Sequence, residues 1–82
     1  MIPSGFYIVD SSAKYINARN PLEEGLVYNG NDGWTRNWGG SHCYNTASEA
    51  IEKARILRAE APVKVLQIQT NGNNIGVGEI QF

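Results

Sequence analysis

One stretch of the sequence decides the fold: TASEAIEKARILRAEAPVKVLQIQ, residues 46–69. Its first four residues match a capping box, in which the Thr46 hydroxyl accepts a hydrogen bond from the backbone N–H of Glu49 and the Glu49 carboxylate reaches back. Small apolar residues then recur at intervals of three and four, and Pro62 prevents the helix from continuing. The predicted apolar face comprises Ala47, Ala50, Ile51, Ala54, Leu57 and Ala61. The pattern predicts a helix over about 46–61 that lies close against a sheet.

Two strands are predicted after this helix. Residues 63–69 are rich in β-branched side chains, and an Asn- and Gly-rich turn follows them and leads into residues 75–82. Gly76 and Gly78 weaken the second strand and indicate a bulge or a sheet edge. That strand could therefore be a loosely ordered tail or an element added to a partner.

Strand and turn signals also fill the region before the helix. The run FYIV at 6–9 is aromatic and β-branched, and the Asn-Gly and Asp-Gly pairs within 29–33 favour a tight turn. The predicted elements are strands over 6–9 and 14–17 forming a first hairpin, a short helical turn over 20–25, and strands over 26–28 and 34–36 forming a second hairpin. We expect one α+β domain over 1–82, with an antiparallel sheet of about four to six short strands packed on one helix.

The composition is that of a globular protein with a single core. The chain has 82 residues, of which 41% are hydrophobic and 18% charged, and no apolar run is long enough to cross a membrane. Export and membrane insertion are not expected, and the only cysteine, Cys43, favours a reducing, cytoplasmic compartment. A net charge of −1 provides no global field for phosphate, so strong non-specific binding of nucleic acid is disfavoured. Formation of a homodimer would enlarge the small core.

The candidate binding site lies at the segment WTRNW, residues 34–38. In a continuous strand Trp34, Arg36 and Trp38 would share one face. The other two candidate binding residues are His42 and Tyr44, and the tyrosines at 7, 15, 28 and 44 could extend the surface. If that face is buried, the tryptophans belong to the core and Arg36 needs a partner. If it is exposed, it provides an anchor for a protein interface or a stacking platform for a nucleotide.

A catalytic or metal site has weaker support. His42 and Cys43 are adjacent, and adjacent side chains on an extended chain point to opposite faces, so the dipeptide does not by itself pair imidazole with thiol. One His and one Cys also fall short of a zinc ligand set. We expect no catalytic residue, no metal and no cofactor.

The layout of the chain resembles that of small phage- and prophage-encoded α+β proteins. The resemblance rests on loosely spaced positions: Phe6-Tyr7-Ile8-Val9, Trp34 and Trp38, Tyr44-x-Thr46-x-x-Glu49-Ala50-Ile51-x-x-Ala54, and residues 63–68. Such proteins are often accessory or antagonist factors that bind a host component. The resemblance implies a binding role and carries over no catalytic residue.

Three functional hypotheses follow. The first is a non-enzymatic binding protein, encoded by a phage or mobile element, that acts on a bacterial host protein as inhibitor or adaptor. The alternative is capture of a small nucleotide or a nucleic-acid strand by stacking, with Arg19, Arg36 or Lys14 meeting phosphate. The third is an enzyme that depends on His42 and Cys43.

Overall fold

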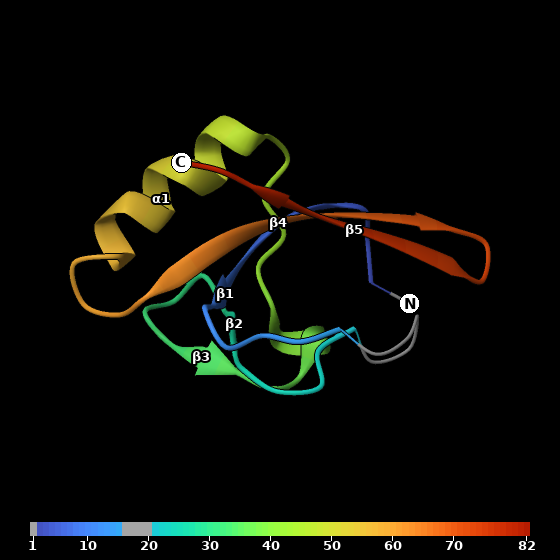
Figure 1. Cartoon of the computed structure of the whole chain (residues 1–82), viewed down its shortest axis with the longest axis horizontal. Coiled ribbons are helices and arrows are strands. Elements are labelled where there is room, and N and C mark those ends of the chain that lie inside the picture. Colours follow the sequence, from blue (N-terminus) through green and yellow to red (C-terminus); the bar gives the residue numbers. More distant parts are fainter. Residues whose placement is uncertain (1, 16–20) are drawn as a thin grey trace.

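The computed structural model describes residues 2–15 and 21–82. Its elements are β1 (Gly5–Asp10), β2 (Val27–Tyr28), β3 (Trp34–Thr35), the 3-10 helix η1 (Trp38–Gly40), α1 (Ala47–Leu57), β4 (Val63–Asn71) and β5 (Asn74–Ile80). The five strands form one antiparallel sheet in the order β3-β2-β1-β4-β5, and α1 packs on β1 and β4 (Figure 1). The predicted α+β layout, an antiparallel sheet with a single helix, is confirmed.

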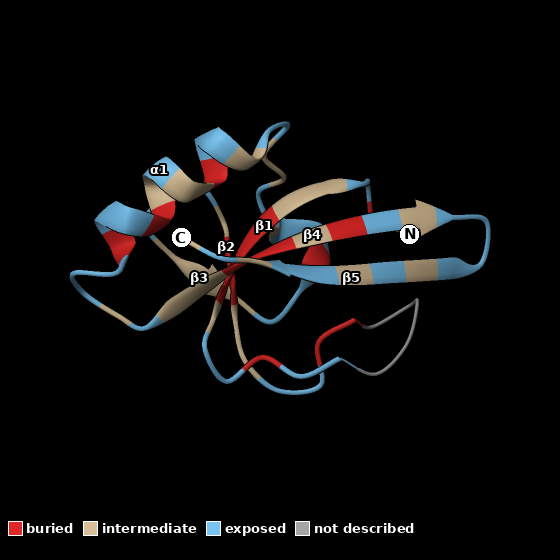
Figure 2. Ribbon diagram, turned by 45° about the horizontal axis from the view of Figure 1, so that its top comes forward, coloured by how far each residue is buried: buried red, intermediate tan, exposed pale blue. Residues whose placement is uncertain are grey.

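The sheet buries apolar side chains on both of its faces. Ile8 and Val65 point to the side covered by α1, whereas Tyr7, Val9 and Leu66 point to the other side. Buried residues therefore run through the centre of the sheet, along β1 and β4 (Figure 2). The helix side contains Ile8, Tyr28, Ala50, Ala54, Leu57 and Val65, and the opposite side contains Ile2, Tyr7, Val9, Ala13, Leu22, Val27, Trp38, Leu66 and Ile68. Irregular chain and η1, rather than a second helix, cover that opposite side.

Helix α1 begins where the sequence predicts. Thr46 is the N-cap, and its hydroxyl accepts a hydrogen bond of 3.2 Å from the backbone N–H of Glu49. Ala50 and Ala54 are fully buried, which confirms the small-residue face. The helix ends at Leu57, four residues before the predicted end, and Arg58 is its C-cap. Backbone hydrogen bonds from Ala59 to Ile56 and from Glu60 to Leu57 then tighten the chain into a final turn before Pro62, where a helix could not continue.

The predicted hairpin between 6–9 and 14–17 is wrong. β1 is paired over its whole length with β4, from Gly5 opposite Ile68 to Asp10 opposite Val63. β2 pairs with the other side of β1, with Val27 opposite Val9. Tyr44 forms a further bridge to Phe6. Lys14 and Tyr15 consequently lie in irregular chain, and the remainder of the predicted second strand lies outside the described residues.

The predicted helical turn over 20–25 is also wrong for 21–25, the part that the structure describes. The backbone of this segment bonds to Lys14 instead: the Lys14 N–H donates to the Glu24 carbonyl at 3.2 Å, and the Glu23 N–H donates to the Lys14 carbonyl at 2.6 Å. These long-range bonds use groups that a local helical turn would need.

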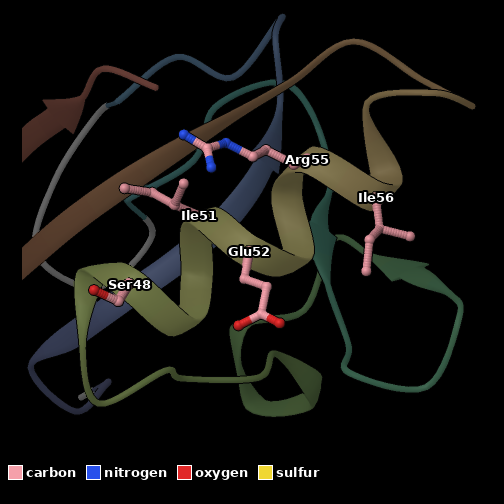
Figure 3. Close-up of a pocket in the computed structure, with 5 residues that line it drawn as sticks. All are labelled: Ser48, Ile51, Glu52, Arg55 and Ile56. Atoms are coloured by element: carbon pink, nitrogen blue, oxygen red, sulfur yellow. The ribbon is translucent and has the colours of Figure 1, made fainter.

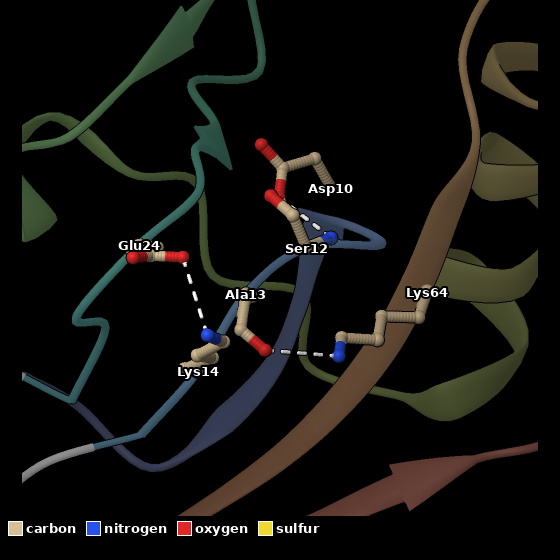
Figure 4. A network of polar contacts seen from close by, with 6 residues as sticks. All are labelled: Asp10, Ser12, Ala13, Lys14, Glu24 and Lys64. Atoms are coloured by element: carbon tan, nitrogen blue, oxygen red, sulfur yellow. Dashed lines mark hydrogen bonds and ion pairs between the residues drawn. The ribbon is translucent and has the colours of Figure 1, made fainter.

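Polar contacts fasten residues 10–14 to the sheet (Figure 4). The Asp10 carboxylate accepts hydrogen bonds from the backbone N–H and hydroxyl of Ser12 and from the backbone N–H of Leu26. Lys64 on β4 donates to the Ala13 carbonyl at 3.1 Å. Lys14 and Glu24 form an ion pair of 3.5 Å, but both side chains are more than half exposed, so the pair adds little stability.

The hairpin of β4 and β5 matches its prediction. The register is continuous from Val65 opposite Ile80 to Asn71 opposite Asn74, so the bulge considered for Gly76 and Gly78 is absent and their other reading, a sheet edge, is confirmed.

Candidate functional site

The two tryptophans of the predicted site lie on opposite faces of the sheet. β3 ends at Thr35, whose hydroxyl accepts from the backbone N–H of Asn37, and Asn37 in turn caps η1 by accepting from the Gly39 N–H. The chain therefore turns before Trp38. The prediction that Trp34, Arg36 and Trp38 share one strand face is wrong, because Asn37 begins a new element.

Trp38 belongs to the core. Only 8% of it is exposed, and its ring meets Tyr7 edge-on with 4.9 Å between centroids, on the face opposite α1. It cannot anchor a partner without leaving the core. Trp34, by contrast, is half-buried on the helix side, with its ring edge-on to Tyr28 at 5.5 Å. Trp34 is therefore the tryptophan that remains available to a ligand.

His42 and Tyr44 join Trp34 on the helix side. The His42 and Tyr44 rings lie 4.4 Å apart, and the His42 backbone N–H donates to the Tyr28 carbonyl at 3.0 Å. Tyr44 exchanges two backbone hydrogen bonds with Phe6, which fixes it beside β1. We call Tyr28, Trp34, His42 and Tyr44 the helix-side aromatic group. Arg36 is exposed, two residues beyond Trp34.

The surroundings of Tyr44 disfavour its ionised form. Burial raises the pKa of Tyr44, and the neighbouring Tyr28 and Glu49 raise it further. The Lys53 ammonium lies 5.6 Å from the Tyr28 ring centroid, within the range of a cation–π contact. Tyr44 thus presents an aromatic ring and a neutral hydroxyl, whereas the Tyr28 hydroxyl is already hydrogen-bonded to Asp32.

A hollow beside Trp34 is the concave part of the site. Its volume is about 370 Å³, and it is lined by Asp10, Ser11, Ser12, Leu26, Trp34, Ala61 and Pro62. We call it the Trp34 pocket. The Asp10 carboxylate is already engaged by Ser12 and Leu26, so the open wall is mainly apolar. Its volume lies at the lower end of the range for small-ligand sites, which leaves room for one large side chain.

Another hollow lies along the outer surface of α1 (Figure 3). Its volume is about 700 Å³, and it is lined by Ser48, Ile51, Glu52, Arg55 and Ile56. All of these residues come from one helix, and their side chains diverge around it in Figure 3. The Trp34 pocket, by contrast, is lined by residues from several segments of the chain. Ile56 on the helix groove is 62% exposed.

His42 and Cys43 do not face one another. The Cys43 sulfur lies 3.6 Å from the Ser4 carbonyl and packs against the core opposite α1, whereas His42 lies against Tyr44. This agrees with the alternation expected along extended chain. Within residues 2–15 and 21–82, no group of three or more His, Cys, Asp or Glu side chains is arranged to hold a metal ion.

The sequence signals identify only part of the Trp34 pocket. The pairing of Tyr28 with Trp34 follows from the hairpin around 29–33. Asp10 and Pro62 were missed, because they come together only when β1 pairs with β4 and the Ser11 N–H donates to the Pro62 carbonyl at 3.2 Å. No local motif signals that contact.

Comparison with known proteins returns no match to any family model, to any curated protein or to any solved structure. The described helices include none with the length and apolar character needed to cross a membrane.

Proposed function

We propose that this chain is a small non-enzymatic binding protein that captures a partner protein by receiving one large apolar side chain in the Trp34 pocket. The observation that carries the proposal is the pocket itself, which combines an apolar hollow of about 370 Å³ with a half-buried tryptophan. Tryptophan and arginine are the residues most enriched at energetic centres of protein interfaces, and exposed Arg36 follows Trp34 closely.

The charge of the lining favours a protein over a nucleotide. A nucleotide site combines stacking with basic groups that meet phosphate, whereas the charged group that lines this pocket is the Asp10 carboxylate. Lys14, one of the predicted phosphate contacts, is paired with Glu24. Arg19, another, lies outside the described residues.

The partner we propose is a bacterial host protein, which the chain would inhibit or adapt in the cytoplasm. This part of the proposal rests on the layout resemblance to phage- and prophage-encoded α+β proteins, and phage origin stays a prediction. A non-enzymatic role agrees with the separation of His42 from Cys43.

Affinity capture from bacterial lysate tests the proposal with three variants. Trp34→Ala removes the pocket wall, Arg36→Glu reverses an exposed charge, and Ile56→Ala is the matched control on the outer helix groove. We expect one dominant protein that Ile56→Ala retains and Trp34→Ala loses. With that protein purified, calorimetry should give a dissociation constant about 30-fold higher for Trp34→Ala, equivalent to about 2 kcal/mol.

Two outcomes would contradict the proposal. Equal capture by Trp34→Ala and the wild type would show that the pocket does not hold the partner. A nucleotide that co-purifies, detected by native mass spectrometry and lost in Trp34→Ala, would favour the stacking alternative. Because Arg36 is exposed, Arg36→Glu should fold normally. Weaker capture by this variant would therefore reflect a lost contact with the partner and not a loss of the fold.

A further inference from the structure

Strand β5 is an open edge of the sheet. Among the described residues it pairs only with β4, over seven residues, with an unbroken register. The opposite edge, β3, has only two residues. Proteins usually protect long edges with lysines, prolines or bulges, because the free backbone groups recruit other strands. β5 has a single charged residue, Glu79, and none of those devices.

The glycines of β5 are not required by the fold of one chain. Neither Gly76 nor Gly78 has a positive φ. A Cβ atom at Gly78 would meet nothing within 4 Å, and one at Gly76 would come no closer than 3.8 Å to the Gln69 carbonyl oxygen. Each glycine costs about 0.5–1 kcal/mol in a strand. A glycine within a strand often marks a site where another backbone approaches closely, which points to a contact outside the single chain.

The glycines lie in an exposed part of the hairpin. β4 and β5 extend away from α1 as a two-stranded arm (Figure 1). Gln67, Gln69, Gly76, Val77 and Gly78 border a shallow hollow of about 260 Å³. On this face the open edge strand therefore exposes backbone at Gly76 and Gly78, beside the side chains of Gln67 and Gln69 on β4.

The geometry of the hairpin identifies the free backbone groups. Asn71 and Asn74 flank a two-residue turn, in which Gly72 has a φ of 63°. The closing pair of such a turn is hydrogen-bonded, and the bonded pairs alternate along the ladder. The N–H and C=O groups of Ile75, Val77 and Glu79 therefore point away from β4.

We propose that a second copy of this chain pairs with β5 in antiparallel orientation, with the two-fold axis at Val77. The segment IGVGE, residues 75–79, is nearly symmetric about that residue. Val77 then faces Val77 of the second copy, Gly76 faces Gly78, and Ile75 faces Glu79. Only in this register do Ile75, Val77 and Glu79 all lie opposite residues of the other copy's β5. The register also places no like charges opposite one another.

The orientation also keeps the two helices apart. Ile80 packs on the helix side of the sheet, whereas the other end of β5 extends beyond α1. An antiparallel copy places its own α1 at that far end, so the helices lie at opposite ends of the joint strand pair. The two sheets become one continuous sheet, and the paired glycines lie where the two copies meet. The contact is isologous, as a closed dimer requires.

A pair of charge variants tests this register. Gly76→Lys with Gly78→Lys places lysine opposite lysine across the axis, whereas Gly76→Lys with Gly78→Glu places lysine opposite glutamate. Both positions have room for a side chain in the single chain, so both double variants should fold. Sedimentation velocity from about 1 μM to about 1 mM should show the wild type rising from the mass of one chain towards two.

We expect the double-lysine variant to dimerise at least tenfold more weakly than the wild type, and the lysine–glutamate variant to remain within threefold of it. The inference is overturned if the wild type stays at the mass of one chain at about 1 mM. It is equally overturned if the two variants associate alike, or if association continues beyond two chains. A Trp34→Ala variant should dimerise as the wild type does, which keeps this test separate from that of the proposed function.

Discussion

At the scale of single residues, the buried Tyr7 makes the stability of the fold depend on pH in alkaline solution. It is fully buried, and its hydroxyl donates a hydrogen bond of 2.6 Å to the Pro3 carbonyl. Burial, together with the hydrogen bond and charge interaction from Cys43, raises its pKa above the usual 10.0. The folded protein therefore holds this proton more tightly than the unfolded chain. The resulting stability is complete below about pH 10 and is lost as the pH rises towards the raised pKa.

We expect Tyr7→Phe to weaken the loss of stability at alkaline pH. At pH 7 the variant should be about 1 kcal/mol less stable, because the hydrogen bond from the buried Tyr7 side chain to the Pro3 carbonyl is lost. Above pH 10 its free energy of unfolding should fall less steeply than that of the wild type. Urea unfolding from pH 7 to pH 11 measures both effects. Parallel curves for the two proteins above pH 10 would contradict the assignment to Tyr7.

At Gly30, as at Gly25, both the backbone conformation and the surroundings exclude a side chain. Its φ is 83°, and a Cβ atom would lie 2.8 Å from Nδ1 of His42. Gly30→Ala should cost about 1–2 kcal/mol from the backbone conformation, and more from the collision with His42. Adding His42→Ala should recover only the second part. Urea unfolding measures both losses, and Gly78→Ala is the matched control, because its Cβ meets nothing and should add about 0.5 kcal/mol.

At the scale of elements, the start of α1 depends on one hydroxyl. Thr46 is exposed, so its side chain contributes through the N-cap hydrogen bond to the Glu49 N–H and not through burial. Thr46→Ala should lower the free energy of unfolding by about 1 kcal/mol, whereas Thr46→Ser should leave it nearly unchanged. Urea unfolding followed by circular dichroism distinguishes the two variants. Equal losses for both would show that the methyl group, not the hydroxyl, is important.

Elements with local chemical signals were predictable from the sequence. The capping residue of α1, the turn between β4 and β5 and the hairpin of β2 and β3 each depend on a few adjacent residues. The neighbours of β1 were not predictable, because residues 14–17, 26–28 and 63–69 were all predicted to form strands. β1 has only two sides on which to pair. Residues 63–68 prevail over 14–17 because they provide a longer run of apolar residues that alternate between two buried faces.

The candidate site shows the same limit. Trp34, His42 and Tyr44 lie on one side of the sheet, but η1 carries Trp38 to the other side. Asn37 caps that short helix within an otherwise strand-like pattern. Asn37 could equally continue a strand or cap a helix, so the sequence alone does not determine in which direction the Trp38 side chain points. The orientation of Trp38 is set instead by its contact with Tyr7, a long-range interaction.

At the scale of the whole molecule, the two proposed contacts use different regions. The molecule measures 35 × 23 × 20 Å, and the β4–β5 arm extends along its longest direction in Figure 1. The Trp34 pocket is formed by the ends of β1 and β2, by β3 and by the segment after α1. β1, the shared neighbour of β2 and β4, lies between the pocket hairpin and the arm. A dimer joined through β5 would therefore carry two pockets at distant ends and bind two partner molecules.

Amide hydrogen exchange, followed residue by residue by NMR, tests this organisation without a variant. β1 and β4 are paired on both sides, so their amides should exchange most slowly. In dilute protein the outward amides of Ile75, Val77 and Glu79 should exchange fast, while those of Gly76 and Gly78, bonded to β4, are protected. Raising the concentration should slow only the outward set, because a second copy covers it. If these amides exchange at the same rate at every concentration, β5 remains a free edge and the pairing proposed for it is wrong.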